Sequence, residues 1–355
     1  MTSANVDGRA DRAADESSGL VRVEHLTKRF GTGPGAVLAV DDLSFEVRPG
    51  RVTGFLGPNG AGKTTTLRML LGLVAPSSGS TSIGGRRYDE IARPAHVVGA
   101  ALEAASFHPG RTARDHLRVY APQVGVPDAR ADEVLELVGL TEAARRRVGG
   151  FSLGMRQRLA LATTLLGDPR VLLLDEPANG LDPEGIAWLR GFLRALAAQG
   201  RTVLVSSHVL SEVEQTVDDV VIIARGRLVH ASPLPELARL ARPRLRVASP
   251  DGARLDALVA ERSWAVEGVD RTTGRTAYDL LDVDDATVGA AAFTAGIELH
   301  TLAGRDVGLE DLFLQLTAAP EPPGPPGQSV PAGPYGKPGA PYGPDGAPTT
   351  NGGER

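Results

Sequence analysis

The chain has 355 residues, too many for one ordinary domain, and its 42% hydrophobic and 23% charged residues are typical of a folded globular protein. Its 43 acidic and 38 basic side chains give a net charge of −5, so no nucleic-acid partner is expected. Cysteine is absent, which excludes disulfides, thiolate catalysis and cysteine-based metal sites. No apolar run approaches the length of about 18 residues that a membrane-spanning helix needs, so any role at a membrane is expected to depend on a partner.

The N-terminal part is predicted to be a leader followed by three strands. Residues 1–19 are polar, acidic and small, lack the features of a signal peptide and are expected to be disordered. Alternation over 21–26 predicts a strand that turns at 27–31, and a second strand is predicted over 37–47. After a Pro-Gly turn, residues 51–56 are predicted to be a short strand.

That strand leads into Gly57-Pro58-Asn59-Gly60-Ala61-Gly62-Lys63-Thr64-Thr65, which matches the pattern G-x-x-x-x-G-K-[ST] without a mismatch. Apolar residues at helical spacing over 65–74 complete the context that the motif needs. The glycines let successive N–H groups turn toward one anion, and the helix N-terminus adds partial positive charge. We predict a nucleoside triphosphate site in which Lys63 reaches the β- and γ-phosphates and Thr64 ligates Mg²⁺. The alternative is a glycine turn that binds nothing.

The middle of the chain changes toward helix. Helical periodicity over 115–120, 130–139 and 153–166 predicts a helical segment between residues 94 and 167. The apolar run 171–174 then predicts a parallel strand that is buried on both faces. It is followed by three further predicted elements: an amphipathic helix over 183–199, a buried strand over 203–205 and a hairpin over 220–229.

Two further groups of polar residues follow predicted buried strands. Asp175 and Glu176 end the leucine-rich strand, and such a pair can divide the work, with Asp175 holding Mg²⁺ and Glu176 activating the attacking water. His208 ends the next buried strand, where it can contact the γ-phosphate or that water. A solvent-facing acidic strand end and a polar strand cap are the alternative readings.

The C-terminal part begins a second unit at about residue 242. Its pattern predicts the order βαββαβ of a ferredoxin-like α+β domain, with strands at 245–247, 264–266, 278–283 and 297–302 and helices at 255–259 and 286–295. A closing helix is predicted over 309–317. Residues 319–355 are rich in Pro and Gly and are expected to form a disordered tail.

Taken in order, these motifs resemble the ATP-binding subunits of ABC transporters over about residues 20–240. The resemblance implies an α/β fold: a P-loop ABC-type ATPase domain over 20–241 with a helical subdomain at 94–167, followed by the small α+β domain at 242–318. It assigns the Mg²⁺ and catalytic carboxylates to Asp175 and Glu176.

The resemblance also implies further site residues. Phe30 lies where the family stacks an aromatic ring on adenine, and His208 corresponds to the switch histidine. Segment 151–155, Phe-Ser-Leu-Gly-Met, lies where the family has the signature Leu-Ser-Gly-Gly-Gln. Ser152 and Gly154 would meet the γ-phosphate there, although Leu and Met replace Gly and Gln.

Two more positions follow from the resemblance. Asp182, in Gly180-Leu181-Asp182, belongs to the loop that crosses to the partner subunit. Glu103 stands at the position of the family's glutamine, where a carboxylate can still contact Mg²⁺ but adds negative charge near the phosphates.

The resemblance finally implies partners. Two copies would sandwich two ATP molecules head to tail, and a separate membrane permease, faced by residues 107–110 and the helices after them, would export a drug, antibiotic or lipid-like substrate. The subunit would be cytoplasmic, held on the inner face of the cell membrane by that permease. The alternatives are a soluble ABC-type ATPase in translation or DNA repair, and a chiefly regulatory protein in which 242–318 senses a ligand.

Overall fold

The computed structural model describes residues 19–102, 107–240, 244–272, 274–305 and 309–318. Three sequence predictions therefore lie outside the described residues: the leader up to residue 18, the Mg²⁺ contact of Glu103, and the tail over 319–355. No helix in the described ranges is both long enough and apolar enough to cross a membrane.

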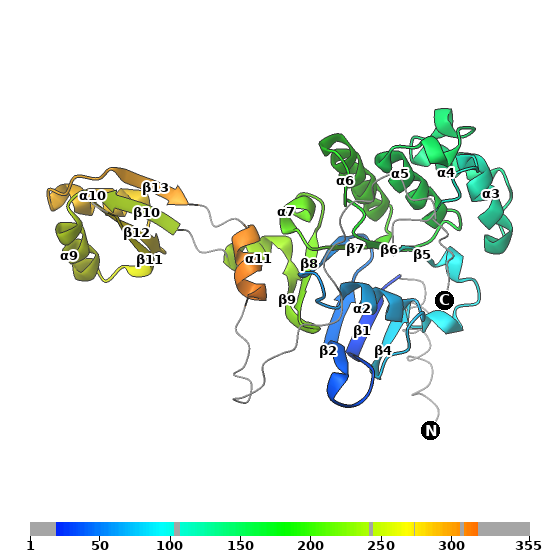
Figure 1. Cartoon of the computed structure of the whole chain (residues 1–355), viewed down its shortest axis with the longest axis horizontal. Coiled ribbons are helices and arrows are strands. Elements are labelled where there is room, and N and C mark those ends of the chain that lie inside the picture. The colour runs from blue at the N-terminus through cyan, green and yellow to red at the C-terminus, as the bar shows by residue number, and fades with distance from the viewer. Residues whose placement is uncertain (1–18, 103–106, 241–243, 273, 306–308, 319–355) are drawn as a thin grey trace, which may run out of the picture. The chain divides into compact units, whose positions relative to one another are not determined.

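Six strands form the central sheet, in the order β5-β6-β7-β3-β8-β9 (Figure 1). They are β3 (Val52–Leu56), β5 (Val98–Ala101), β6 (Val171–Asp175), β7 (Thr202–Ser207), β8 (Asp219–Ala224) and β9 (Arg227–Pro233). The first five strands in this order are parallel, and β9 returns antiparallel to β8 as the predicted hairpin. Because β3, β6 and β7 are parallel neighbours, the loops after their carboxyl ends meet at one edge of the sheet.

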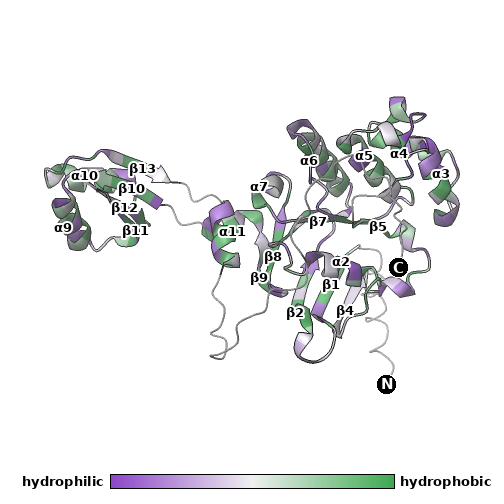
Figure 2. Ribbon diagram, viewed as in Figure 1, coloured by the Kyte–Doolittle hydropathy of each residue, from purple (hydrophilic) through white to green (hydrophobic). Residues whose placement is uncertain are grey.

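The central sheet is covered on both faces, as the continuous apolar run of β6 predicts. Leu172 and Leu174 pack into the core on one face, while Val171 and Leu173 pack into the core on the other, and all four are fully buried. The green interior strands of Figure 2 show the same concentration of apolar residues. Burying each of these side chains contributes about 1.5–3 kcal/mol.

One face of the central sheet packs against an antiparallel sheet and α2 (Lys63–Leu70). The antiparallel sheet has the order β2-β1-β4 and consists of β1 (Val21–Phe30), β2 (Val37–Val47) and β4 (Ser78–Ile83). The predicted turn at 27–31 was wrong, since β1 continues to Phe30, which pairs with Val37. Cross-strand pairing carries the strand through irregular register at Leu26 and Lys28, which local sequence does not reveal.

The other face carries the helices. They are α3 (Ala113–Val124), α4 (Arg130–Leu137), α5 (Leu153–Thr164), α6 (Pro183–Ala198), α7 (Leu210–Val213) and α8 (Leu234–Leu240). Helices α3, α4 and α5 pack on one another, and α5 contacts β5, the edge strand of the sheet (Figure 1). The helices that the sequence predicted between residues 94 and 167 are thus confirmed.

The C-terminal elements between residues 244 and 305 have a sheet and a core of their own. They are β10 (Arg244–Ser249), α9 (Gly252–Arg262), β11 (Ala265–Thr272), β12 (Arg275–Leu281), α10 (Asp285–Thr294) and β13 (Thr301–Arg305). The sheet order is β11-β12-β10-β13, and all paired neighbours are antiparallel. The predicted βαββαβ order is confirmed. The last strand starts at Thr301 rather than residue 297, because Ile297 is buried in the core beside α10.

Helix α11 (Leu309–Thr317) has a different partner from the one predicted. The sequence placed it in the 242–318 unit, but Leu312 and Phe313, 8% and 4% exposed, join the helical core of the ATPase-like domain. There α11 contacts α7, α8, β8 and β9 (Figure 1). An amphipathic pattern identifies the buried face of a helix but not the surface that covers it.

Candidate active site

Glycine at two positions of the loop between β3 and α2 is dictated by close backbone contacts. A Cβ at Gly57 would lie 2.4 Å from the carbonyl oxygen of Ile223, and one at Gly62 would lie 2.5 Å from that of Ala39. Gly62 also has a φ of +105°, which side chains rarely adopt. The loop is therefore held tightly between β2 and β8, and larger residues at either position would displace it.

Helix α2 begins at Lys63, directly after this loop, and no side chain caps its N-terminus. The first N–H groups of a helix have no partner within the helix, and the helix dipole makes this end attractive for an anion. The glycine loop and the uncapped helix end together fit a phosphate group.

The ammonium group of Lys63 lies inside this site. Its side chain is 6% exposed, and Nζ donates to the carbonyl oxygens of Gly57 at 2.6 Å and Pro58 at 3.4 Å. Burial lowers the pKa of Lys63, and the nearby carboxylates of Glu176 and Asp175 oppose this shift. An ammonium group that is buried among carbonyl oxygens and carboxylates has lost most of its water, and it can donate strong hydrogen bonds to the oxygens of an incoming phosphate.

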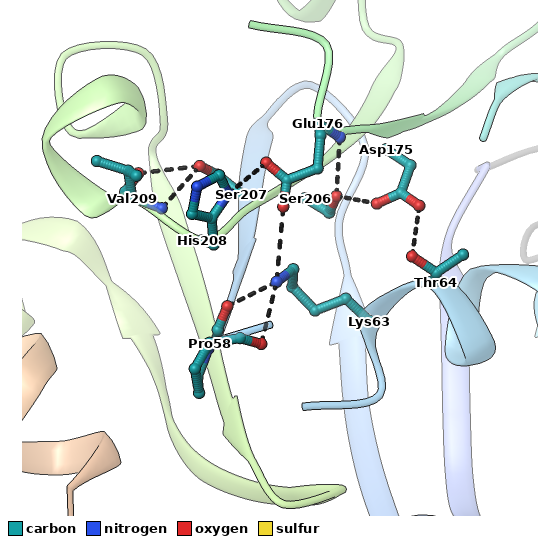
Figure 3. A network of polar contacts seen from close by, with 10 residues as sticks. Pro58, Lys63, Thr64, Asp175, Glu176, Ser206, Ser207, His208 and Val209 are labelled. Carbon is teal, nitrogen blue, oxygen red and sulfur yellow. Dashed lines mark hydrogen bonds and ion pairs between the residues drawn. The ribbon is translucent and has the colours of Figure 1, made fainter. Parts of the chain in front are cut away.

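Asp175, at the end of β6, lies against the first turn of α2. The Thr64 hydroxyl donates to Asp175 Oδ2 at 2.7 Å (Figure 3). Among the described residues, no group of three or more His, Cys, Asp or Glu side chains is placed to hold a metal ion. One hydroxyl and one carboxylate suit Mg²⁺ that completes its shell with water and substrate phosphate, so these residues fit that ion.

Glu176 links the phosphate loop to His208. Its Oε1 lies 3.6 Å from Lys63 Nζ, and its Oε2 lies 2.8 Å from Nδ1 of His208 (Figure 3). Because a carboxylate only accepts, Nδ1 carries the proton in this bond. Glu176 has a φ of +49°, in the left-handed region, which is uncommon for a residue with a side chain and directs the carboxylate toward these partners.

Ser206 is part of this network but was not among the predicted site residues. It is fully buried near the end of β7, and its hydroxyl contacts Asp175 and the backbone of Glu176 (Figure 3). The signal in the sequence was a polar residue directly after the apolar run of β7. The register between β6 and β7, which local sequence does not give, puts Ser206 opposite Asp175.

The signature segment is separate from this network. Ser152 is the N-cap of α5, where its hydroxyl accepts from the N–H of Met155 at 3.2 Å. Leu153 packs on the following loop, since a Cβ at Gly180 would lie 2.6 Å from its Cδ2. A Cβ at Gly154 would lie 3.7 Å from Leu181. Leu153, which stands where the family signature has glycine, therefore packs the signature segment against the loop at 180–182.

Two other predicted residues have local contacts as well. Asp182 is the N-cap of α6 and accepts from the N–H of Gly185 at 2.8 Å, a structural role that the sequence reasoning did not include. Phe30 is 43% exposed at the end of β1, and Lys28 Nζ lies 4.9 Å from its ring centroid. An exposed aromatic ring with a cation on one face suits stacking of a base.

Comparison with known proteins agrees with this geometry. A family profile described as ABC transporter matches residues 40–179. The bacitracin transport ATP-binding protein BcrA of Bacillus licheniformis is 44% identical over 228 residues, which cover 62% of this chain and 72% of BcrA. The chain belongs to the ATP-binding subunits of ABC transporters. It is therefore an ATP-binding protein and an ATPase.

Two further similarities extend this result. The Nod factor export ATP-binding protein I of Burkholderia pseudomallei is 38% identical over 291 residues, covering 79% of this chain and 92% of that protein. A solved structure described as the ATP-binding subunit of an ABC transporter superposes with a TM-score of 0.54 at 28% identity, covering 62% of this chain and 92% of that one.

Proposed function

We propose that this ABC subunit hydrolyses ATP at the site formed by residues 57–65, Asp175, Glu176 and His208, and that hydrolysis drives export by a separate membrane permease. The observation that carries the proposal is the meeting of Lys63, Glu176 and His208: Glu176 forms an ion pair with Lys63 and a hydrogen bond with His208. Three segments far apart in the sequence supply a phosphate-binding cation, a carboxylate and an imidazole at one sheet edge.

The residues divide the reaction as follows. The loop at 57–65 binds the phosphates, with the first turn of α2 and Lys63 facing the β- and γ-phosphates. Thr64 and Asp175 hold Mg²⁺, which neutralises phosphate charge when bound. Glu176 accepts a proton from the attacking water, and His208 orients that water or the γ-phosphate.

Binding of ATP changes the partners of Lys63. In the structure Lys63 bonds to two loop carbonyls, and its ion pair with Glu176 is 3.6 Å long. A γ-phosphate offers this ammonium a stronger acceptor. Glu176 then loses its ion pair with Lys63 but keeps its hydrogen bond to His208, so its Oε1 can accept a proton from the water.

The proposal includes a head-to-tail dimer of this chain. Ser152 bonds within its own helix, and among the described residues it makes no hydrogen bond to the phosphate loop. A second copy would bring its Ser152, Gly154 and Asp182 to the phosphates bound by the first, with Phe30 stacking on adenine. Glu103, which lies outside the described residues, would contribute at the metal. Each site would then be completed only when two chains meet.

The permease and cargo are proposed from the relatives. BcrA is named for bacitracin transport, and the Burkholderia protein for Nod factor export. We assign this subunit an antibiotic- or lipid-like cargo and a place on the cytoplasmic face of the cell membrane, attached through its permease. Residues 107–110 and the helices after them would receive the permease.

Purification of the full chain from native membranes, followed by mass spectrometry and ATPase assay, tests the proposal. We expect Mg²⁺-dependent release of phosphate and recovery with one polytopic membrane protein. Recovery only from the soluble fraction, alone or with ribosomes or DNA, would overturn the transport role, and a purified chain that does not hydrolyse ATP would overturn the assigned site.

A further inference from the structure

Ser206 lies at the junction of the two catalytic carboxylates. It is the fifth residue of β7, is fully buried, and stands opposite Asp175 in the parallel pairing of β6 with β7. A buried hydroxyl at this position needs partners, because an unpaired one would be destabilising.

The Ser206 hydroxyl bonds in both directions. It donates to Oδ1 of Asp175, and it accepts from the backbone N–H of Glu176 at 3.0 Å (Figure 3). A hydroxyl has one hydrogen to donate and two lone pairs. One side chain thus connects the carboxylate of the first acidic residue to the backbone of the second.

The bond to Asp175 fixes the rotation of its carboxylate. Oδ1 accepts from Ser206 while Oδ2 accepts from Thr64 at 2.7 Å, so each oxygen has its own donor. Without Ser206, the carboxylate could turn about its terminal torsion, which is soft in aspartate. The oxygen that faces Thr64 and the metal position would then be less well defined.

The bond to Glu176 supports an unusual backbone. With a φ of +49°, Glu176 lies in a region that side chains seldom occupy unless surrounding contacts hold them there. The Ser206 hydroxyl anchors the N–H of this residue. The same backbone conformation sends the Glu176 carboxylate to Lys63 and His208.

We infer that Ser206 is a positioning residue for hydrolysis, which sets the orientation of Asp175 and the backbone of Glu176 relative to the phosphate loop. The inference rests on the proposed function. Ser206 touches neither substrate nor water in this role and acts through the two carboxylates. Its loss should therefore lower turnover more than it lowers nucleotide binding, which depends on Lys63 and the N-terminus of α2.

The test compares Ser206→Ala with Thr202→Val in the full chain. Thr202 is the first residue of β7, is also fully buried, and its hydroxyl donates to the Gly19 carbonyl oxygen at 2.7 Å, away from the carboxylates. Each variant lacks one buried hydroxyl of β7, so the two variants differ in which contacts that hydroxyl made. Turnover, KM for ATP, affinity for a fluorescent ATP analogue in EDTA, and thermal unfolding are measured for each.

We expect Ser206→Ala to lower kcat by about 10- to 100-fold, because small displacements of catalytic groups have effects of this size, with KM and Mg²⁺-free affinity changed by less than about 3-fold. Thr202→Val should keep kcat within about 3-fold of wild type. Ser206→Cys, which keeps the shape but bonds weakly, should give an intermediate kcat and decides the matter if the alanine variant does not fold.

Three results would overturn the inference. The first is a Ser206→Ala kcat equal to that of Thr202→Val, and the second is a loss of Mg²⁺-free affinity as large as the loss of kcat. The third is full turnover in Ser206→Cys when the alanine variant is unfolded. A wild-type chain without ATPase activity would instead contradict the proposed function, so the two failures are distinguishable.

Discussion

His208 donates from Nδ1 to Oε2 of Glu176 at 2.8 Å, so the residue that follows β7 is bonded to the residue that follows β6. The other oxygen of Glu176 faces Lys63 at 3.6 Å. Glu176 is thus shared between an imidazole and an ammonium group, and His208 is 37% exposed in its side chain. This pairing places the Glu176 carboxylate between His208, directly after β7, and Lys63, the first residue of α2.

Replacement of Glu176 by Gln tests the role of this carboxylate. The amide preserves size and can still bond to His208, but it accepts no proton from water. We expect nucleotide binding to be retained while turnover falls by about 10²–10⁴, the usual contribution of a general base. Equilibrium binding of an ATP analogue and steady-state phosphate release measure the two effects.

The exposed residue Glu136 on α4 provides the matched control, since Glu136→Gln makes the same chemical change on a helix that supplies no residue of the network. It should leave both quantities unchanged. Full ATPase activity in Glu176→Gln would show that another group activates the water.

Replacement of Lys63 tests the phosphate site itself. Lys63→Ala removes a buried cation and opens a cavity, whereas Lys63→Met removes the charge but keeps an unbranched apolar stem in the buried slot. We expect both to weaken ATP binding by at least about 10-fold, because each loses a charge-assisted bond to phosphate worth about 1.5–3 kcal/mol. Titration calorimetry measures the affinity. Wild-type affinity in Lys63→Met would contradict the central assignment.

Local motifs predicted most of the candidate site. The loop at 57–65, the pair Asp175-Glu176 and His208 each stand next to a strand or helix that the hydrophobic pattern identified. Their meeting at one edge follows from parallel pairing, which an apolar run indicates. The contributions of Ser206 and of the bond between Glu176 and His208 depend on side-chain orientation and strand register, and these are tertiary properties.

The sequence predicted the fold less well where contacts between distant segments determine the length or the position of an element. The extension of β1 to Phe30 depends on pairing with β2, and the docking of α11 depends on a complementary apolar surface more than 60 residues earlier in the chain. The pattern of α11 identified Leu312 and Phe313 as buried but left their partner open. A truncation at residue 243, intended to remove a separate sensor, would also remove these core residues.

His116 predicts a pH dependence of stability. It is 4% exposed on α3, its Nδ1 has no hydrogen-bond partner in the described structure, and Phe107 and Tyr120 contact its ring at their edges. Burial lowers the pKa of His116, and the charge of Arg111 lowers it further. The unfolded chain therefore binds a proton below about pH 6.5 where the folded chain does not, so stability is complete above that pH and is lost as the pH falls toward the folded pKa.

We expect His116→Phe to reduce this loss, since Phe fills the same apolar site and does not titrate. The midpoint of thermal unfolding, followed from pH 7.5 to 5.0, should fall less in the variant than in wild type. The exposed residue His25 supplies the control, and His25→Gln should follow the wild-type curve. Parallel curves for His116→Phe and wild type would contradict the assignment.

Phe313 tests the docking of α11. Its side chain is 4% exposed in the helical core, whereas its neighbour Leu314 is 55% exposed on the same helix. We expect Phe313→Ala to cost about 3 kcal/mol, the low end of the range for such changes, because α11 lies at the margin of that core. Leu314→Ala should cost less than about 0.5 kcal/mol, as surface changes usually do. Urea unfolding of the ATPase domain, followed through Trp188 on α6, gives both values. If both variants lowered the free energy of unfolding by the same small amount, α11 would not contribute to that core. Truncation at residue 243 would then leave the stability of the ATPase domain unchanged.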